Sequence, residues 1–309
     1  MKAIGKKSGK KAFLKNVKRS RWLYLMFALP FLYFIVFKYG AMAWLVIAFE
    51  DFNAFKGVFH SKLVGLKWFK TFISDPYFWN IVKNTIVLNL WNIVICFPAP
   101  ILLALLVNEV KNKAFKKFTQ TVSYLPYFLS TVVVCGFITN IVASDGLINQ
   151  ILKTVGMEPV TFLMEPQWFR PIYVISELWQ GCGWGSIIYL AALAGVDQQL
   201  YEAASIDGAS KLQQLIHISL PGIVSVISVQ FLLTVGRILS IGYEKIILLY
   251  NGSTYKTADV ISTYVYRRGL IEANYSYGAA VSIFQSVIAL FLVVMANKAA
   301  KKVGQTSLW

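Results

Sequence analysis

Residues 202–221 read EAASIDGASKLQQLIHISLP, and this stretch lies between two long apolar runs. Its apolar residues recur at helical spacing on either side of Gly208, which predicts two short helices. Glycine adopts a positive φ at little cost, so Gly208 suits a sharp turn between them. Pro221 opens the following apolar run, at a position where a missing N–H costs nothing. The sequence therefore predicts an ordered helical hairpin, which indicates a surface on which a partner docks.

The composition of the chain places the apolar runs in a lipid bilayer. Hydrophobic residues make up 57% of the chain and charged residues only 14%, whereas soluble domains contain about 25% charged residues. A net charge of +16 is also found in nucleic-acid-binding proteins, but here the basic residues are spread along a very apolar chain and form no recognition helix. We therefore expect membrane lipid, and no nucleic acid, among the partners.

Six segments are long enough to cross a hydrocarbon core, which needs about 20 apolar residues for each helix. They are residues 22–49, 81–107, 121–143, 169–196, 222–250 and 277–297. The prolines inside the second and third segments are tolerated where neighbouring helices satisfy the freed backbone groups. In the fourth segment, Gly181, Gly183 and Gly185 allow another helix to approach closely. The predicted fold is an all-α membrane protein with six transmembrane helices.

The distribution of Lys and Arg predicts the orientation of these helices. Nine basic residues precede Trp22, four lie in residues 108–120, and three follow Asn297. With six spans, all three regions and the loop 197–221 fall on one side, so both termini are expected in the cytoplasm. The predicted organisation is a basic cytoplasmic tail (1–21), a first helix with an extracellular loop (22–79), a transmembrane core that contains the cytoplasmic loop (80–297), and a second cytoplasmic tail (298–309).

The basic N-terminal tail and the apolar run after it also have features of a cleaved signal peptide. Ala41-Met42-Ala43 has the small-x-small form of a cleavage site. The run is longer than the apolar region of a signal peptide and continues past this site, so we favour a retained first helix. The tail is then a flexible cytoplasmic anchor attracted to anionic lipid.

Polar residues recur within the predicted spans at spacings that place them on one face of each helix. In the fifth span, four of them fall within about 80° of one another at 100° per residue. Ionisable groups in lipid are costly and mark transport pathways or paired structural sites, and aromatic rings beside amides and carboxylates suit sugars. The candidate substrate path comprises Gln230, Thr234, Arg237 and Glu244 of the fifth span, Glu177, Trp179, Gln180 and Trp184 of the fourth, Asn89 and Asn92 of the second, and the aromatic neighbour Tyr243.

A structural role for the charged members of this set is the alternative. Arg237 and one of the carboxylates, Glu177 or Glu244, would then neutralise each other and hold helices together. Lys245 is expected to extend toward the outer surface.

The pattern Glu-Ala-Ala-x3-Gly-x9-Ile-x-Leu-Pro, which begins at Glu202, resembles position for position the cytoplasmic coupling motif of permease subunits in bacterial ATP-binding-cassette importers. A looser resemblance covers residues 80–297 and includes Leu190-Ala-Ala-Leu193. Many family members carry proline where Asp197 stands, and aspartate can cap the helix instead. The resemblance implies the type I importer permease fold. It also implies an ATPase-coupling role for Glu202, Ala203, Ala204, Asp207, Gly208, Ile218, Leu220 and Pro221.

The resemblance further implies a multi-subunit importer in the bacterial cell membrane. Such a permease works with a second homologous permease subunit, two ATP-binding-cassette ATPase subunits whose clefts receive the coupling helices, and an extracellular solute-binding lipoprotein. ATP and Mg belong to the ATPase, so no cofactor is expected on this chain. The wording Leu200-Tyr-Glu-Ala-Ala and Ile206-Asp-Gly-Ala209 is most similar to importers of polysaccharides or complex oligosaccharides, which implies a carbohydrate substrate.

The residues themselves agree with a role that is not enzymatic. The sequence contains no Gly-x4-Gly-Lys-[Ser/Thr] phosphate loop. His60 and His217 fall on opposite sides of the membrane, and Cys96, Cys135 and Cys182 lack metal-ligand spacing, so no catalytic or metal site is expected. The alternatives are an importer permease for a solute that is not a sugar, a secondary carrier with inverted repeats and broken half-helices, a membrane enzyme with clustered catalytic residues, and a structural membrane subunit.

Overall fold

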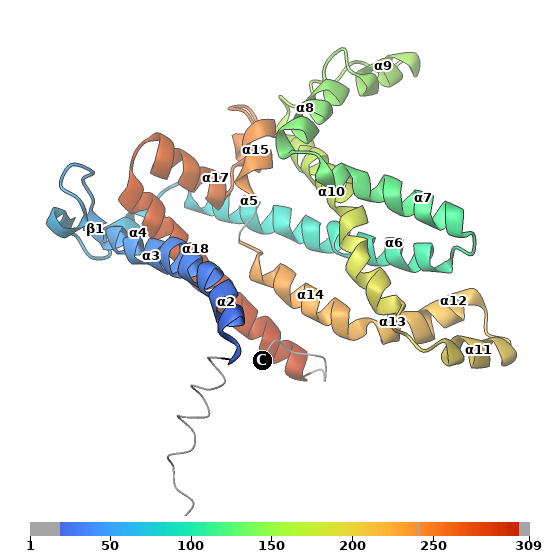
Figure 1. Ribbon diagram of the computed structural model, residues 1–309. Coiled ribbons are helices and arrows are strands. Elements are labelled where there is room, and N and C mark those ends of the chain that lie inside the picture. The colour runs from blue at the N-terminus through green and yellow to red at the C-terminus, as the bar shows by residue number, and fades with distance from the viewer. Residues whose placement is uncertain (1–18, 240–241, 303–309) are drawn as a thin grey trace, which may run out of the picture. The chain divides into compact units, whose positions relative to one another are not determined.

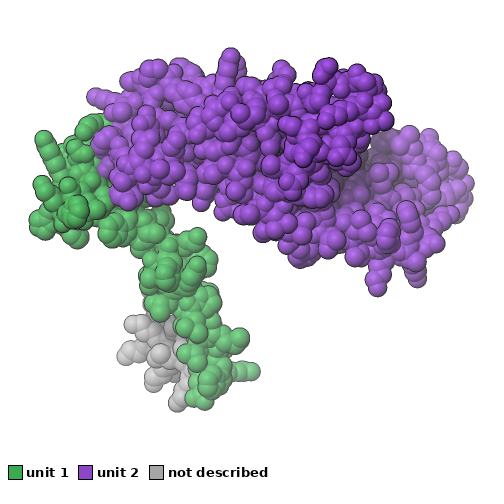
Figure 2. All heavy atoms as spheres, turned by 90° about the horizontal axis from the view of Figure 1, so that it is seen from above, with its two compact units in different colours: residues 1–67 green, residues 68–309 purple. Residues whose placement is uncertain are grey.

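The computed structural model describes residues 19–239 and 242–302. Most of the basic N-terminal tail and the last residues of the C-terminal tail therefore lie outside the described residues. The chain forms two compact units, residues 1–67 and residues 68–309 (Figure 2). The described residues are mostly helical, with one short antiparallel pair of strands (Figure 1).

The first unit is built on an apolar helical segment, Arg21–Phe49. It consists of α2 (Arg21–Phe34), a π-helical turn (Ile35–Tyr39), α3 (Gly40–Ala43) and a 3-10 helix (Trp44–Phe49). Most of its large apolar side chains are exposed, which is typical of a helix surrounded by lipid. The strand β1 (Glu50–Asp51) then pairs antiparallel with β2 (Lys62–Leu63), and a short 3-10 turn (Val58–His60) lies between them in the chain.

The second unit is a bundle of helices joined by turns and loops. From the unit boundary onward the helices are α4 (Lys67–Ile73), α5 (Phe78–Trp91), α6 (Pro98–Glu109), α7 (Lys113–Tyr124), α8 (Thr131–Val142), α9 (Leu147–Thr154), α10 (Pro166–Leu193), α11 (Gln198–Ile206), α12 (Lys211–Gln214), α13 (Leu220–Gly222), α14 (Val224–Gly236), α15 (Tyr243–Leu249), α16 (Tyr255–Ala258), α17 (Ile261–Val265) and α18 (Tyr275–Lys302). Turns of π-helix cover Asn92–Cys96, Leu215–Ser219 and Tyr266–Ile271, and a 3-10 turn covers Leu125–Phe128.

The helix α10 is the centre of this unit. It contacts α5, α6, α7, α14, α15 and α16, and Figure 1 shows it crossing the bundle. A Cβ atom at Gly183 would lie 1.9 Å from the carbonyl oxygen of Ser123, and one at Gly185 would lie 3.1 Å from Cγ of Pro100. The prediction of close helix approach is therefore confirmed at both glycines. It is wrong at Gly181, where a Cβ would meet no described atom within 4 Å.

Four described segments are long and apolar enough to cross a membrane, and a fifth is added if two segments bent by 61°, Lys211–Gly222 and Val224–Gly236, count as one span. The four are Arg21–Phe49, Phe78–Glu109, Thr131–Thr154 and Tyr275–Lys298. The fourth predicted span falls on α10, which has 28 residues and is therefore about 42 Å long at 1.5 Å per residue. That length exceeds a hydrocarbon core of about 30 Å.

The fifth predicted span, residues 222–250, is not a single helix, and the prediction is wrong on this point. The helix α14 ends at Gly236, and α15 begins at Tyr243. Arg237 has already left helical geometry, with φ −102° and ψ 6°. Glycine is a poor helix former, which favours an end at Gly236. The helical periodicity that placed Glu244 beside Arg237 therefore does not extend across the break.

The third predicted span is divided in the same way. The helix α7 ends at Tyr124, and the next turn contains Pro126, whose ring nitrogen cannot donate a helical hydrogen bond. The helix α8 then begins after Ser130, whose hydroxyl oxygen accepts from the backbone N–H of Val133 at 3.4 Å. Proline and a serine cap thus replace one long helix by two.

A polar cluster joins α5, α10 and the segment after α16 at one end of the bundle. Asn84 is 1% exposed and donates to the carbonyl oxygens of Lys256 at 3.1 Å and Asp259 at 3.0 Å. Its own oxygen accepts from Arg170 at 2.8 Å. The carboxylate of Asp259 is fully buried and pairs with Arg267 at 2.5 Å. Because buried polar groups are costly without partners, this cluster fixes the ends of the helices relative to one another.

The contact at Gly183 gives a direct test of this packing. We expect Gly183→Ala to destabilise the folded protein by about 1–3 kcal/mol, the usual cost of overpacking, because the added Cβ would collide with the Ser123 carbonyl. The measurement is the thermal unfolding of the purified protein in detergent. Gly181→Ala on the same helix is the matched control and should unfold at or above the wild-type temperature. Equal stability of the two variants would contradict the packing.

Candidate functional site

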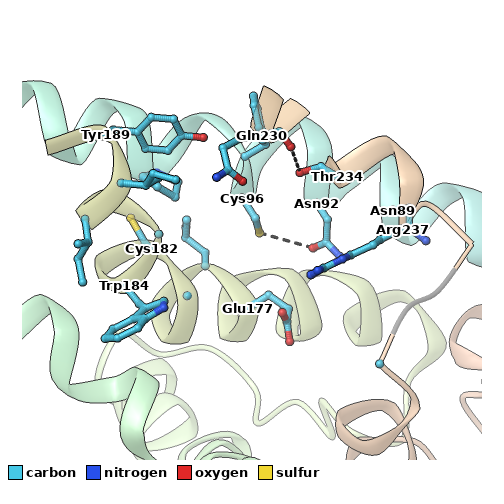
Figure 3. Close-up of a pocket in the computed structure, with 18 of the residues that line it drawn as sticks. Asn89, Asn92, Cys96, Glu177, Cys182, Trp184, Tyr189, Gln230, Thr234 and Arg237 are labelled. Carbon is cyan, nitrogen blue, oxygen red and sulfur yellow. Dashed lines mark hydrogen bonds between the residues drawn. The ribbon is translucent and has the colours of Figure 1, made fainter. Parts of the chain in front are cut away.

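A cavity of about 890 Å³ opens beside α10 (Figure 3). Its walls come from α5 and the π-helical turn after it, from α6, from α10 and from α14. Pockets that bind small molecules commonly measure about 300–1,000 Å³. The lining consists of Asn89, Asn92, Cys96, Phe97, Pro100, Tyr173, Glu177, Leu178, Gly181, Cys182, Trp184, Gly185, Ile187, Ile188, Tyr189, Ala191, Gln230, Thr234, Arg237 and Gly242. The cavity is therefore large enough for a small solute and combines polar with aromatic side chains.

Most residues of the predicted substrate path meet in this cavity. These are Asn89, Asn92, Glu177, Trp184, Gln230, Thr234 and Arg237. They come from segments far apart in the sequence, which agrees with the prediction that polar faces of the second, fourth and fifth spans are turned toward one another.

Four predicted residues, Trp179, Gln180, Tyr243 and Glu244, are not part of the cavity lining. Gln180 accepts from Lys245 at 2.8 Å. Trp179 stacks on Phe137 with ring centroids 6.1 Å apart. Tyr243 stacks on Tyr266 at 5.3 Å. Glu244 is exposed on α15, beyond the break that ends α14.

The local backbone explains how the polar side chains reach the cavity. On α14, Gln230 and Thr234 are one helical turn apart, and the Thr234 hydroxyl donates to the Gln230 carbonyl at 2.8 Å. Arg237 directly follows the last residue of α14 and is exposed. Asn92 begins the π-helical turn, and turns of this kind are frequent at functional sites. Its side-chain oxygen accepts from the Cys96 thiol at 3.5 Å.

The charged groups pair differently from the prediction. Lys245 was expected to extend toward the outer surface, but its side chain is only 6% exposed and its Nζ lies 2.6 Å from Oε1 of Glu177. It also donates to Oε1 of Gln180 at 2.8 Å. The alternative that paired Arg237 with Glu177 or Glu244 is not borne out in the described part of the chain, where no carboxylate oxygen lies within 4.0 Å of Arg237.

Sequence reasoning missed the ion pair of Lys245 with Glu177 and several residues that line the cavity. A lysine inside the apolar run that follows Glu244 was the available signal for a buried ion pair. Tyr173 precedes Glu177 by one helical turn, and Cys96 follows Asn92 by four residues, so both share the faces already assigned to the path.

The loop at residues 197–221 forms the predicted helical hairpin. The two short helices are α11 and α12, and Gly208 between them has φ +77°. The carboxylate of Asp197 caps α11 by accepting from the backbone N–H of Gln199 at 3.0 Å. Glu202, Ala203, Asp207 and Gly208 are exposed, while Ala204 is half-buried. The hairpin thus presents one accessible surface.

A buried glutamine holds this hairpin together. Gln214 is 3% exposed, and its amide nitrogen donates to the Ser205 hydroxyl at 2.9 Å and to the Ala209 carbonyl at 3.3 Å. Lys211 donates to its side-chain oxygen at 3.1 Å and forms an ion pair with Glu109, at the end of α6, at 3.5 Å. The hairpin is therefore fastened both across its turn and to the bundle.

Comparison with known proteins identifies the family. A family model described as "Binding-protein-dependent transport system inner membrane component" matches residues 96–304. The chain belongs to this family. It is 44% identical over 307 residues to the polygalacturonan/rhamnogalacturonan transport system permease protein YteP of Bacillus subtilis (strain 168), a match that covers 99% of this chain and 96% of YteP.

Comparison with solved structures agrees with this family assignment. The chain is similar to a chain in the crystal structure of a bacterial ABC transporter involved in the import of the acidic polysaccharide alginate, with 40% identity, a TM-score of 0.87, and coverage of 94% of this chain and 99% of that one. A second crystal structure is of a bacterial alginate ABC transporter in complex with an alginate pentasaccharide-bound periplasmic protein. This match also has 40% identity and a TM-score of 0.87, and it covers 95% of this chain and 99% of the other.

These findings confirm the resemblance seen in the sequence. The chain is a permease subunit of an ATP-driven importer in the cell membrane and works with a solute-binding protein. It is a membrane component and not an enzyme, because ATP is hydrolysed on a separate ATPase subunit.

Cysteine labelling tests whether α14 faces water at the cavity. In a background in which Cys96, Cys135 and Cys182 are replaced by alanine, we expect Gln230→Cys and Thr234→Cys to react with a membrane-impermeant thiol reagent in at least one state of the ATP cycle. Both positions line the cavity.

The matched control is Leu233→Cys, on the same helix. Leu233 is exposed but lies outside the cavity lining, so its thiol should stay unlabelled in lipid. Labelling of Leu233→Cys alone would contradict the assignment of faces.

Proposed function

We propose that this chain is one half of the pore of an importer for acidic oligosaccharides that an extracellular binding protein delivers. The observation that carries this proposal is Arg237, which is exposed in the cavity and has no carboxylate within 4.0 Å in the described part of the chain. A guanidinium forms charge-assisted forked hydrogen bonds with carboxylates. By their printed names, YteP transports polygalacturonan or rhamnogalacturonan and the solved transporter imports the acidic polysaccharide alginate, which supports the same substrate class here.

The other cavity residues suit the neutral parts of a sugar. The amides of Asn89, Asn92 and Gln230 line the cavity, and amides offer both donors and acceptors to hydroxyl groups. Trp184 supplies an aromatic ring at the cavity, against which the C–H face of a sugar packs. Substrate recognition in this proposal combines one charge with several neutral contacts.

The assembly that we propose contains a second homologous permease subunit, two ATPase subunits that carry ATP and Mg, and a solute-binding lipoprotein. This chain supplies one coupling hairpin, and a dimer of ATPases offers two clefts. The exposed surface of the hairpin, with Glu202, Ala203 and Asp207, is the part that enters an ATPase cleft. Gly208 makes its turn, while Ile218, Leu220 and Pro221 lead into the next helix.

For the topology we propose six transmembrane helices with both termini in the cytoplasm. The 28 residues of α10 and the broken segment from Lys211 to Gly236 are added to the four apolar segments. The lysines of residues 108–120 and those at the end of α18 then lie on the cytoplasmic side, as the charge rule for membrane helices requires.

The substrate proposal is tested at Arg237. We expect Arg237→Gln to lower the uptake of a galacturonate trimer by roughly 10- to 100-fold, because a hydrogen bond to a charged group contributes about 1.5–3 kcal/mol and about 1.4 kcal/mol corresponds to a factor of ten. The measurement is uptake of labelled trimer by cells that express the complete transporter.

Arg237→Lys keeps the charge but loses the forked geometry, so its uptake should fall between wild type and Arg237→Gln. Uptake of a neutral galactose trimer is measured in parallel. Efficient uptake of only the neutral trimer, or wild-type uptake by a fully assembled Arg237→Gln variant, would contradict the proposal.

The coupling role is tested at Gly208. A Cβ there would meet no described atom of this chain within 4 Å, and the backbone has φ +77°, so within this chain the strain of a substitution lies in the backbone. We expect Gly208→Val to lose ATP-driven uptake, because a β-branched residue is strained at positive φ. Gly208→Asn should remain active, since asparagine tolerates this conformation.

The measurements are uptake, ATPase stimulation by the loaded binding protein, and the affinity of that protein for its sugar. The sugar affinity should be the same in all three transporters. Full stimulation and uptake in Gly208→Val would rule out the role of the turn.

A further inference from the structure

Lys245 is a buried cation that does not line the cavity. It lies on α15 and is 6% exposed. Its ammonium is held by Oε1 of Glu177 at 2.6 Å and by Oε1 of Gln180 at 2.8 Å. Both partners lie on α10, so the lysine contacts the cavity wall on the side that faces away from the cavity.

Glu177, the carboxylate partner of Lys245, also faces the cavity. Glu177 lines the cavity, and 36% of its side chain is exposed. One side of its carboxylate therefore faces the path of the solute, while the other meets Lys245. Lys245 is buried, as are Ile246 and Leu249 of the same helix, and the buried Cys135 thiol donates to the backbone carbonyl of Lys245 at 3.9 Å. In such surroundings an ammonium attracts a nearby carboxylate strongly.

The cavity consequently has an unequal balance of charges. Among its described lining residues, Glu177 is the only carboxylate and Arg237 the only cation. Without Lys245 these two charges would cancel over the volume of the cavity. With Lys245 behind the carboxylate, the cavity and its wall carry two cations against one anion.

We propose that Lys245 determines the charge selectivity of the cavity without touching the solute: by neutralising Glu177, it leaves the charge of Arg237 to act on anionic solutes. Applied to transport, this inference rests on the proposed function, because it explains how a cavity that contains a carboxylate accepts an acidic sugar. Like charges across a binding surface disfavour wrong partners, and an unneutralised Glu177 would repel each uronate unit.

The test reads the charge of the cavity directly and does not depend on the identity of the solute. In the cysteine-free background, Thr234→Cys serves as the reporter, because Thr234 lines the cavity. The assembled transporter in lipid vesicles is treated with a negatively charged and a positively charged thiol reagent of similar size. The measured quantity is the ratio of the two reaction rates, divided by the same ratio for a free cysteine peptide.

We expect the reporter to favour the anionic reagent when Lys245 is present. Lys245→Met should lower this preference by about tenfold, since it exposes an unneutralised carboxylate in the cavity. The double variant Lys245→Met/Glu177→Gln removes both charges and should recover the preference. Glu177→Gln alone should keep or raise it, because the lysine then has only neutral partners.

A purely structural ion pair would give a different pattern. Both reagents would then change in rate together, and the two single variants would lower the thermal unfolding temperature without changing the ratio. An unchanged ratio in assembled Lys245→Met would overturn the inference. If Lys245→Met fails to assemble, Glu177→Gln decides: a fall in anionic preference there would overturn it.

Uptake measurements separate this inference from the proposed function. If the charge ratio behaves as expected but the galacturonate trimer is not imported, the substrate assignment fails while the role of Lys245 stands. If the trimer is imported and the ratio is insensitive to Lys245, the role of Lys245 fails alone.

Discussion

The ion pair between Glu177 of α10 and Lys245 of α15 is the contact on which the wall of the cavity depends. An isolated charge inside a membrane protein costs several kcal/mol unless a partner compensates it, and here the two partners lie 2.6 Å apart. Gln180 shares the ammonium and also donates to the carbonyl oxygen of Leu129, just before α8. Two helices and the segment before α8 thus meet at one polar contact.

The central position of α10 depends on a second constraint, which is steric. Ser123 approaches Gly183 so closely that no side chain fits between them. One face of α10 is therefore packed against backbone, while another carries Glu177 and Trp184 to the cavity.

The hairpin that we propose for ATPase docking on the cytoplasmic side also has one packed face and one free face. There Gln214 is buried and fully hydrogen-bonded, and this frees the outer surface of α11 for a partner.

Local sequence signals predicted the hairpin and much of the cavity. Gly208, Asp197 and Pro221 each act through the backbone of their own neighbourhood, so their effects are visible in the sequence. The spacing of Gln230 and Thr234, and of Asn89 and Asn92, is also a local property, and all four residues line the cavity. The prediction failed for Glu244, because an argument from helical periodicity holds only within one helix and α14 ends at Gly236.

The sequence by itself determined that this chain is an apolar helical membrane protein with a structured polar hairpin, because composition and short-range periodicity follow from the chain alone. Its motif also identified the family. Only the tertiary structure decided which charges pair. The sequence offered a pairing of Arg237 with Glu177 or Glu244, yet the partner of Glu177 is Lys245, because the break after α14 and the packing of α15 set the distances. Coulombic attraction depends on the distance between two charges in space, and the order of residues along the chain does not specify that distance.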